Sequence, residues 1–197
     1  MRVIGGRLRG RKLYTPRGLE VRPTSDRVRE AIFNILRNHI QGENVLDLFA
    51  GTGALGIEAL SRGAQGAVFV EKSARSLAVL TRNLAVLGLL PKAEVLPLEV
   101  SSGIRVLQAR GRTFGLVFLD PPYEKGLVRH TLAELDRSPI LASGAVIVAE
   151  HSPAEEWGPF SRLQQVDQRK YGGTEVSIFR PAPDPLRSNE KIRPEGP

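Results

Sequence analysis

The feature that most constrains this 197-residue chain is a regular alternation of short apolar runs and amphipathic segments that starts at Asn44. The apolar runs predict buried strands, and the amphipathic segments predict helices. We expect strands over 45–49, 67–70, 93–96, 115–119 and 145–149. We expect helices over 55–62, 77–87, 104–109 and 127–135. Strands separated by helices form βαβ units, so the sequence predicts an α/β fold with a doubly wound, mostly parallel sheet.

The two ends of this pattern predict further elements. Residues 163–166 and 174–179 read as strands, and Tyr171-Gly172-Gly173 between them is typical of a turn, which predicts an antiparallel pair at one edge of the sheet. Residues 2–14 alternate basic and apolar side chains around glycines, which predicts a short basic hairpin. A helix is expected between this hairpin and the first strand. Its apolar positions Val28, Ile32, Ile35 and Leu36 share one face, and Thr24, Ser25 or Asp26 can cap it.

The length suits one globular domain, which we place at residues 1–181 with a basic N-terminal extension over 1–23. Residues 182–197 are polar and rich in proline, and we expect them to be disordered.

A glycine-rich loop follows the first strand of the alternating pattern. Gly51-Thr52-Gly53-Ala54-Leu55-Gly56 matches G-x-G-x-x-G, which often binds a dinucleotide. Asp47 lies just before this loop, and an acid there would repel a pyrophosphate. A ligand with a positive amino group and no phosphate suits the site better. S-adenosylmethionine fits that description, and an NAD-dependent oxidoreductase is the disfavoured alternative.

The tetrapeptide Asp120-Pro121-Pro122-Tyr123 follows the apolar run that ends at Leu119. An exocyclic amino nitrogen of a base is a poor nucleophile because its lone pair is delocalised into the ring. The Asp120 carboxylate and the Pro121 carbonyl can accept hydrogen bonds from its two N–H groups. The double proline restricts the backbone that carries these two acceptors. Tyr123 offers a ring on which an extruded base can stack. The tetrapeptide looks like the catalytic motif of an amino-methyltransferase, which implies Asp120, Pro121, Pro122 and Tyr123 as catalytic residues; a simple strand stop is the alternative.

Composition excludes several kinds of site. The chain has no cysteine, which removes disulfides and zinc–thiolate sites and agrees with a cytoplasmic protein. Its three histidines have no ligand spacing, so we expect no metal. The longest apolar runs fall far short of the roughly 20 residues that span a bilayer, so we expect no membrane partner.

Positive charge is concentrated at the N-terminus. Residues 1–30 hold nine Arg and Lys against three acids, within a net charge of +7 for the whole chain. This imbalance favours contact with nucleic-acid phosphates. The candidate residues are Arg2, Arg7, Arg9, Arg11 and Lys12 on the hairpin, with Arg22 and Arg27 near the following helix.

The first predicted strand and the loop after it resemble known methyltransferases. The run from Val45 to Gly53 resembles the first motif of the Rossmann-like methyltransferases. In that family an acid after the second strand holds the ribose, and Glu71 occupies this position here. Glu99 falls where many relatives carry an aspartate near the adenine. The resemblance implies cofactor contacts from Asp47, Phe49, Ala50, Gly51, Thr52, Gly53, Glu71 and Glu99, with S-adenosylhomocysteine as the product.

The segment from Arg22 to Leu36 is similar to the N-terminal helix motif of the RsmD-type small-subunit rRNA guanine-N2 methyltransferases. The opening residues 1–13 and the late 171–175 resemble the same family, which covers roughly residues 1–180. This resemblance implies that a monomer methylates N2 of a guanine in bacterial 16S rRNA. The implied substrate is the small subunit or its assembly intermediate, with ribosomal proteins beside the RNA. An adenine-N6 methyltransferase on DNA or RNA and a non-catalytic rRNA-binding assembly factor are the alternatives.

Overall fold

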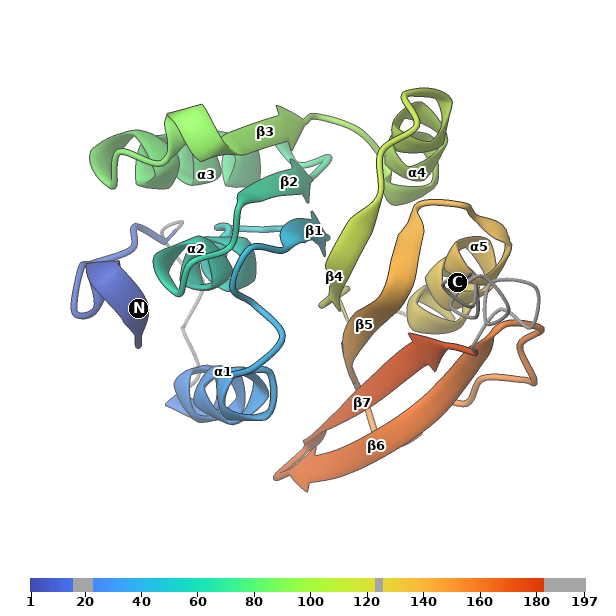
Figure 1. Ribbon diagram of the computed structural model, residues 1–197. Helices are drawn as coiled ribbons and strands as arrows, with labels where there is room; N and C mark the ends of the chain where they lie inside the picture. The colour runs from blue at the N-terminus through green and yellow to red at the C-terminus, as the bar shows by residue number, and fades with distance from the viewer. Residues whose placement is uncertain (16–22, 123–125, 183–197) are drawn as a thin grey trace, which may run out of the picture.

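The computed structural model describes residues 1–15, 23–122 and 126–182, and Figure 1 shows their arrangement around a central sheet. The sheet has seven strands in the order β3-β2-β1-β4-β5-β7-β6. They are β1 (Asn44–Leu48), β2 (Gly66–Val70), β3 (Ala93–Leu96), β4 (Phe114–Leu119), β5 (Leu141–His151), β6 (Leu163–Tyr171) and β7 (Thr174–Pro181). Strands β1 to β5 are parallel, and β7 runs antiparallel to both β5 and β6. The predicted doubly wound α/β fold with an antiparallel edge pair is confirmed.

Helices cover both faces of this sheet (Figure 1). They are α1 (Pro23–Ile35), α2 (Ala54–Ser61), α3 (Ala74–Val86), α4 (Val100–Ala109) and α5 (Leu127–Arg137), with 3₁₀ turns η1 (Gly6–Leu8) and η2 (Leu90–Lys92). Side chains of α1, α2 and α3 pack in one hydrophobic cluster with one face of the strands, and those of α4 and α5 pack in a second cluster on the other face. Each buried strand therefore supplies apolar residues to two cores, which explains its continuous apolar run.

Several boundaries differ from the predicted ones. Helix α1 begins at Pro23, so Thr24, Ser25 and Asp26 lie inside its first turn and the predicted cap is wrong. Strand β1 ends at Leu48, one residue before the predicted end. Strand β6 extends to Tyr171 because its backbone pairs with β7 along its whole length, although most of its side chains are exposed.

The N-terminal residues form the expected hairpin. Arg2 and Lys12 make an antiparallel bridge, the Val3 amide donates to the Arg11 carbonyl at 3.0 Å, and the Gly10 amide donates to the Val3 carbonyl at 2.9 Å. We call residues 1–14 the N-terminal ribbon. Its apolar side chains Val3 and Leu13 are buried in the same core as α1 and α2.

Buried polar side chains of α2 hold the backbone of this ribbon. The carboxylate of Glu58 accepts from the amides of Ile4 and Gly5, each at 2.7 Å, and from Arg62 Nε at 2.8 Å. The Ser61 hydroxyl donates to the Gly5 carbonyl at 2.6 Å. Because these contacts use the backbone of the ribbon, they leave its basic side chains free to point outward.

Within the described ranges, no helix has the length and apolar character needed to cross a bilayer. The predicted disorder of the C-terminal tail falls almost entirely on residues 183–197, which lie outside the described part of the chain.

Candidate active site

The glycine-rich loop joins β1 to α2 at the carboxyl edge of the sheet. Phe49 has φ +63°, and Gly53 at the start of α2 has φ +81°. The amide of Gly56 donates to Asp47 Oδ2 at 2.9 Å, so the acid on β1 is tied to the first turn of α2. A Cβ at Gly56 would collide with the ring of Phe69, which explains why glycine is needed where α2 crosses β2. The loop is thus a tight turn, and its residues Gly51 and Thr52 line the pocket described below.

Glu71 lies beside the same loop, immediately after β2. Its Oε2 accepts from the Gly51 amide at 2.8 Å, and its Oε1 accepts from the Ser73 amide at 2.7 Å. A carboxylate has about four acceptor positions, so each oxygen keeps one for a ligand hydroxyl. The arrangement orients the Glu71 side chain before any ligand binds.

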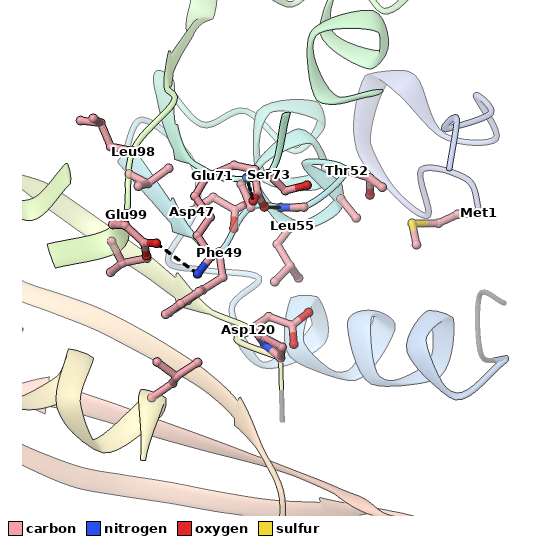
Figure 2. A pocket seen from close by; sticks show the side chains of 18 residues that line it. Met1, Asp47, Phe49, Thr52, Leu55, Glu71, Ser73, Leu98, Glu99 and Asp120 are labelled. Carbon is pink, nitrogen blue, oxygen red and sulfur yellow. Dashed lines mark hydrogen bonds and ion pairs between the residues drawn. The ribbon is translucent and has the colours of Figure 1, made fainter. Parts of the chain in front are cut away.

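A pocket of about 450 Å³ lies at this edge of the sheet, and Figure 2 shows the acids that line it. The structure brings nine of the residues predicted from the sequence into its wall: Asp47, Phe49, Ala50, Gly51, Thr52, Glu71, Glu99, Asp120 and Pro122. Gly53 and Pro121 are not among the lining residues: Gly53 is the N-cap residue of α2, and Pro121 is buried. Tyr123 lies outside the described residues.

Sequence reasoning missed other parts of this wall. Leu55, Val70 and Leu98 add apolar surface, and Met1 reaches the pocket from the N-terminal ribbon. Leu98 could have been found from its place after the third predicted strand, since ligands of such sheets bind at the carboxyl ends of strands. No local signal marks Met1.

The pocket is electrostatically unusual. Burial, together with the charges of Asp120 and Glu71, raises the pKa of Asp47 well above its usual value, although the hydrogen bond from Gly56 opposes the shift. Asp120 lines the pocket and keeps exposed surface there. The protein packed around it still desolvates its carboxyl group, which raises the pKa of Asp120 to about 6. Lys72 is the one basic side chain of the described wall, and it pairs with Glu99 at 3.1 Å at the exposed rim. A positively charged ligand would relieve the repulsion among these acids.

Glu150 is a charged neighbour of Asp120 that the sequence analysis did not single out. The register pairs Leu119 of β4 with Ala149 of β5, so the next residues along the two strands are Asp120 and Glu150. Burial and the charge of Asp120 raise the pKa of Glu150 to about 8. Two acidic residues therefore follow paired positions of β4 and β5 at the carboxyl edge of the sheet, and the charge of one acts on the other.

The predicted phosphate-binding residues that the structure describes are exposed. Arg2, Arg7, Arg9, Arg11 and Lys12 all have exposed side chains on the ribbon. A groove of about 390 Å³ separates the ribbon from α1, and Arg2, Arg9 and Arg27 line it together with Asp26 and Glu30. Arg22 lies outside the described residues.

Asn83 of α3 connects this basic surface to the pocket. Its side-chain amide donates to the carbonyls of Tyr14 and Thr52, at 3.1 and 3.0 Å, and its oxygen accepts from the Tyr14 amide at 2.7 Å. Asn83 is 1% exposed. The end of the ribbon and the glycine-rich loop are therefore fastened to the same buried side chain.

The described residues contain no group of three or more metal-ligating side chains arranged around a common point.

The parallel sheet, the glycine-rich loop, the acid on β1 and the acids after β2 and β4 together define a Rossmann-like methyltransferase. Residues 1–180 match the model of the family described as "Conserved hypothetical protein 95". The chain belongs to this family, the RsmD-type rRNA methyltransferases.

Named relatives agree with this assignment. The chain is 36% identical over 181 residues to the putative rRNA methyltransferase YlbH of Bacillus subtilis, which covers 91% of this chain and 98% of the relative. It is 43% identical over 150 residues to ribosomal RNA small subunit methyltransferase D of Escherichia coli, covering 76% and 74% of the two chains. Among solved structures, the putative methyltransferase yhhF of Escherichia coli is similar with a TM-score of 0.79 and 34% identity, over 92% of this chain and 97% of that one.

Proposed function

We propose that this protein transfers a methyl group from S-adenosylmethionine to N2 of a guanine in 16S rRNA, within the small subunit or an intermediate of its assembly. The observation that carries the proposal is the position of Asp120. It lies at the carboxyl end of β4 in the same pocket as Asp47 and Glu71, next to the glycine-rich loop. An acceptor for the target amino group thus faces a site suited to a cationic cofactor.

The wall of the pocket fits S-adenosylmethionine chemically. Asp47, Glu71 and Asp120 surround a space with one basic side chain among the described wall residues, and an ammonium and a sulfonium would neutralise them. Glu71 would accept from the ribose hydroxyls, and Phe49, Val70 and Leu98 would cover the adenosine. Bound there, the cofactor supplies an electrophilic methyl group.

The residues of the tetrapeptide would activate the target. Asp120 accepts one N–H of the amino group and the Pro121 carbonyl accepts the other, which favours a nitrogen whose lone pair faces the methyl group. Tyr123 would stack on the extruded base. Most of the rate enhancement then comes from holding the two reactants in line.

The direct test incubates the full chain with tritiated S-adenosylmethionine and small subunits from a strain that lacks this methylation, followed by nucleoside analysis. N2-methylguanosine supports the proposal, and N6-methyladenosine would assign the same chemistry to adenine. No incorporation, together with no cofactor binding, would favour the non-catalytic assembly factor. Naked 16S rRNA assayed in parallel separates the free RNA from the assembled subunit as the substrate.

RNA would bind through the N-terminal ribbon, whose backbone is fixed to α2 and whose basic side chains are exposed. Deleting the ribbon would also remove the buried Val3 and Leu13, so charge substitutions test this role more cleanly. We expect Arg7→Gln with Arg9→Gln to reduce the salt dependence of RNA binding by about one unit of slope per lost phosphate contact. Arg105→Gln with Arg129→Gln, which removes two exposed charges from α4 and α5, is the matched control. An equal change in both double variants would contradict the proposed surface.

A further inference from the structure

The pair formed by Asp120 and Glu150 suggests how the acceptor of the target amino group is held, an inference that rests on the proposed methyl transfer. Leu116 and Phe118 of β4 and Val146 and Val148 of β5 belong to the cluster on the α1 side of the sheet. Side chains of a strand alternate between its faces, so Asp120 and Glu150 continue these rows on the same side. With Leu119 paired to Ala149, Asp120 and Glu150 occupy the next positions of adjacent strands, and the charge of Asp120 acts on Glu150.

Among the residues that the structure describes, the charged groups of the neighbouring strands and of α1 are engaged elsewhere. On β7, the neighbour of Glu150 is the apolar Val176, and on β6 the next in the row is Arg169, which pairs with Asp167 at 2.9 Å. On α1, Arg29 is directed to Asp26 and to the Arg2 carbonyl.

Across the pocket, Asp47 is a further acid, and the charge of Asp120 contributes to its raised pKa. Two acids this close in a crowded site do not both ionise near neutral pH, because like charges repel and each charge is poorly solvated. One of them keeps a proton. The pKa of Glu150, raised to about 8, lies above that of Asp120, raised to about 6, so the proton stays on Glu150.

We propose that Glu150 is a positioning residue for methyl transfer: in its protonated form it donates a hydrogen bond to one carboxylate oxygen of Asp120 and leaves the other oxygen to the target amino group. During the reaction the methylated nitrogen loses one proton, and Asp120 takes it. The pair then holds two protons, and the proton on Asp120 passes to water when the product leaves. Glu150 begins and ends the cycle protonated.

This role gives methyl transfer an alkaline limit. As pH rises through about 8, Glu150 loses its proton, the donor disappears, and the two carboxylates repel each other. The wild-type rate of single-turnover transfer should therefore fall about tenfold between pH ~7 and pH ~9. Glu150→Gln keeps a side-chain N–H donor that cannot ionise, so its rate should fall by less than about twofold over the same range. Glu150→Ala has no donor and should be slower than the Gln variant by about tenfold at pH ~7. Assaying the three proteins in parallel controls for any loss of activity that comes from instability of the cofactor or the RNA at high pH.

A second measurement needs neither cofactor nor RNA. Carboxyl carbon NMR of the free protein, labelled at Asp and Glu, should show Glu150 titrating well above the usual value of about 4.3 for a glutamate. In Asp120→Asn the same resonance should titrate at lower pH, because the neighbouring charge is gone.

Glu150 titrating in the ordinary range, or a Gln variant that follows the wild-type alkaline loss, would overturn the proposal. A titration as expected from a protein that methylates no guanine would instead place the error in the proposed function.

Discussion

Two regions of this protein hold buried or crowded acids, and they use them in opposite ways. Where the N-terminal ribbon packs on α2, Glu58 is 1% exposed and accepts from two backbone amides and from Arg62. In the pocket, burial raises the pKa values of Asp47 and Asp120, and the charges of Asp120 and Glu71 raise that of Asp47 further. The fold supplies the positive partners in the first region. In the second, Lys72 is the one basic side chain of the described wall and pairs with Glu99, so the proposed cofactor would supply the positive partners of Asp47 and Asp120.

The largest effect should follow from removing the acceptor in the pocket. Asp120→Ala is expected to lower the rate of methyl transfer by about 10³-fold, because one preorganised acceptor of the developing charge is lost. Cofactor affinity, measured by calorimetry, should change by less than about threefold, since other residues hold the cofactor. Glu156→Ala removes an exposed acid and serves as the control. A variant with wild-type activity would refute the catalytic role of Asp120.

The next largest effect should appear in the other region and in stability. Glu58→Ala leaves the Ile4 and Gly5 amides without their acceptor, and we expect a loss of about 3 kcal/mol in the free energy of unfolding. Glu94, which contacts Arg110 and Arg112 at a partly exposed site, is the matched comparison. Glu94→Ala should cost less than about 1 kcal/mol in the same urea titration. Equal losses would mean that burial of the acid does not decide its contribution.

The contrast also predicts how pH acts on the ligand-free protein. A carboxyl group whose pKa is raised by folding stabilises the fold while it is protonated and destabilises it as it ionises. The contributions of Asp120 and Glu150 should be lost as pH rises through about 6 and about 8, and that of Asp47 should also be lost on the alkaline side. The free energy of unfolding should therefore fall from about pH 5 to about pH 9, and fall less in Asp120→Asn with Glu150→Gln. Urea unfolding across this range checks the sign, and a parallel decline in both proteins would contradict it.

The two regions also differ in how well the sequence predicted them. The glycine-rich loop, Asp47 and Asp120 lie within short motifs whose residue types follow from local geometry, so their places at the ends of two strands were predicted. The ribbon contacts of Glu58 and Asn83 join positions 53 to 69 residues apart, and only the packed fold creates them. Glu150 acquires its role from the register between β4 and β5. In the sequence it is one acid after an apolar run, with nothing to pair it with Asp120.

Strand β6 shows the limit of hydrophobic patterning. Its middle residues are mostly exposed, so no alternation of polar and apolar residues marks the strand beyond Val166. Backbone hydrogen bonds to β7 define it instead, and these leave no trace in the side-chain pattern.

The smallest effect should come from Glu99, which lines the pocket at its exposed rim. It pairs with Lys72 at the rim of the pocket, and both side chains are about two-thirds exposed, at 66% and 67%. Exposed ion pairs contribute little, so Glu99→Gln should change the free energy of unfolding by less than about 0.5 kcal/mol. Glu71→Gln is the comparison, because Glu71 accepts from Gly51 and Ser73 and is oriented by both. We expect cofactor affinity to fall about threefold in the Glu99 variant and about 30-fold in the Glu71 variant, measured by calorimetry. If the two losses are equal, Glu99 must leave Lys72 and contact the cofactor instead, which would make the rim part of the binding site.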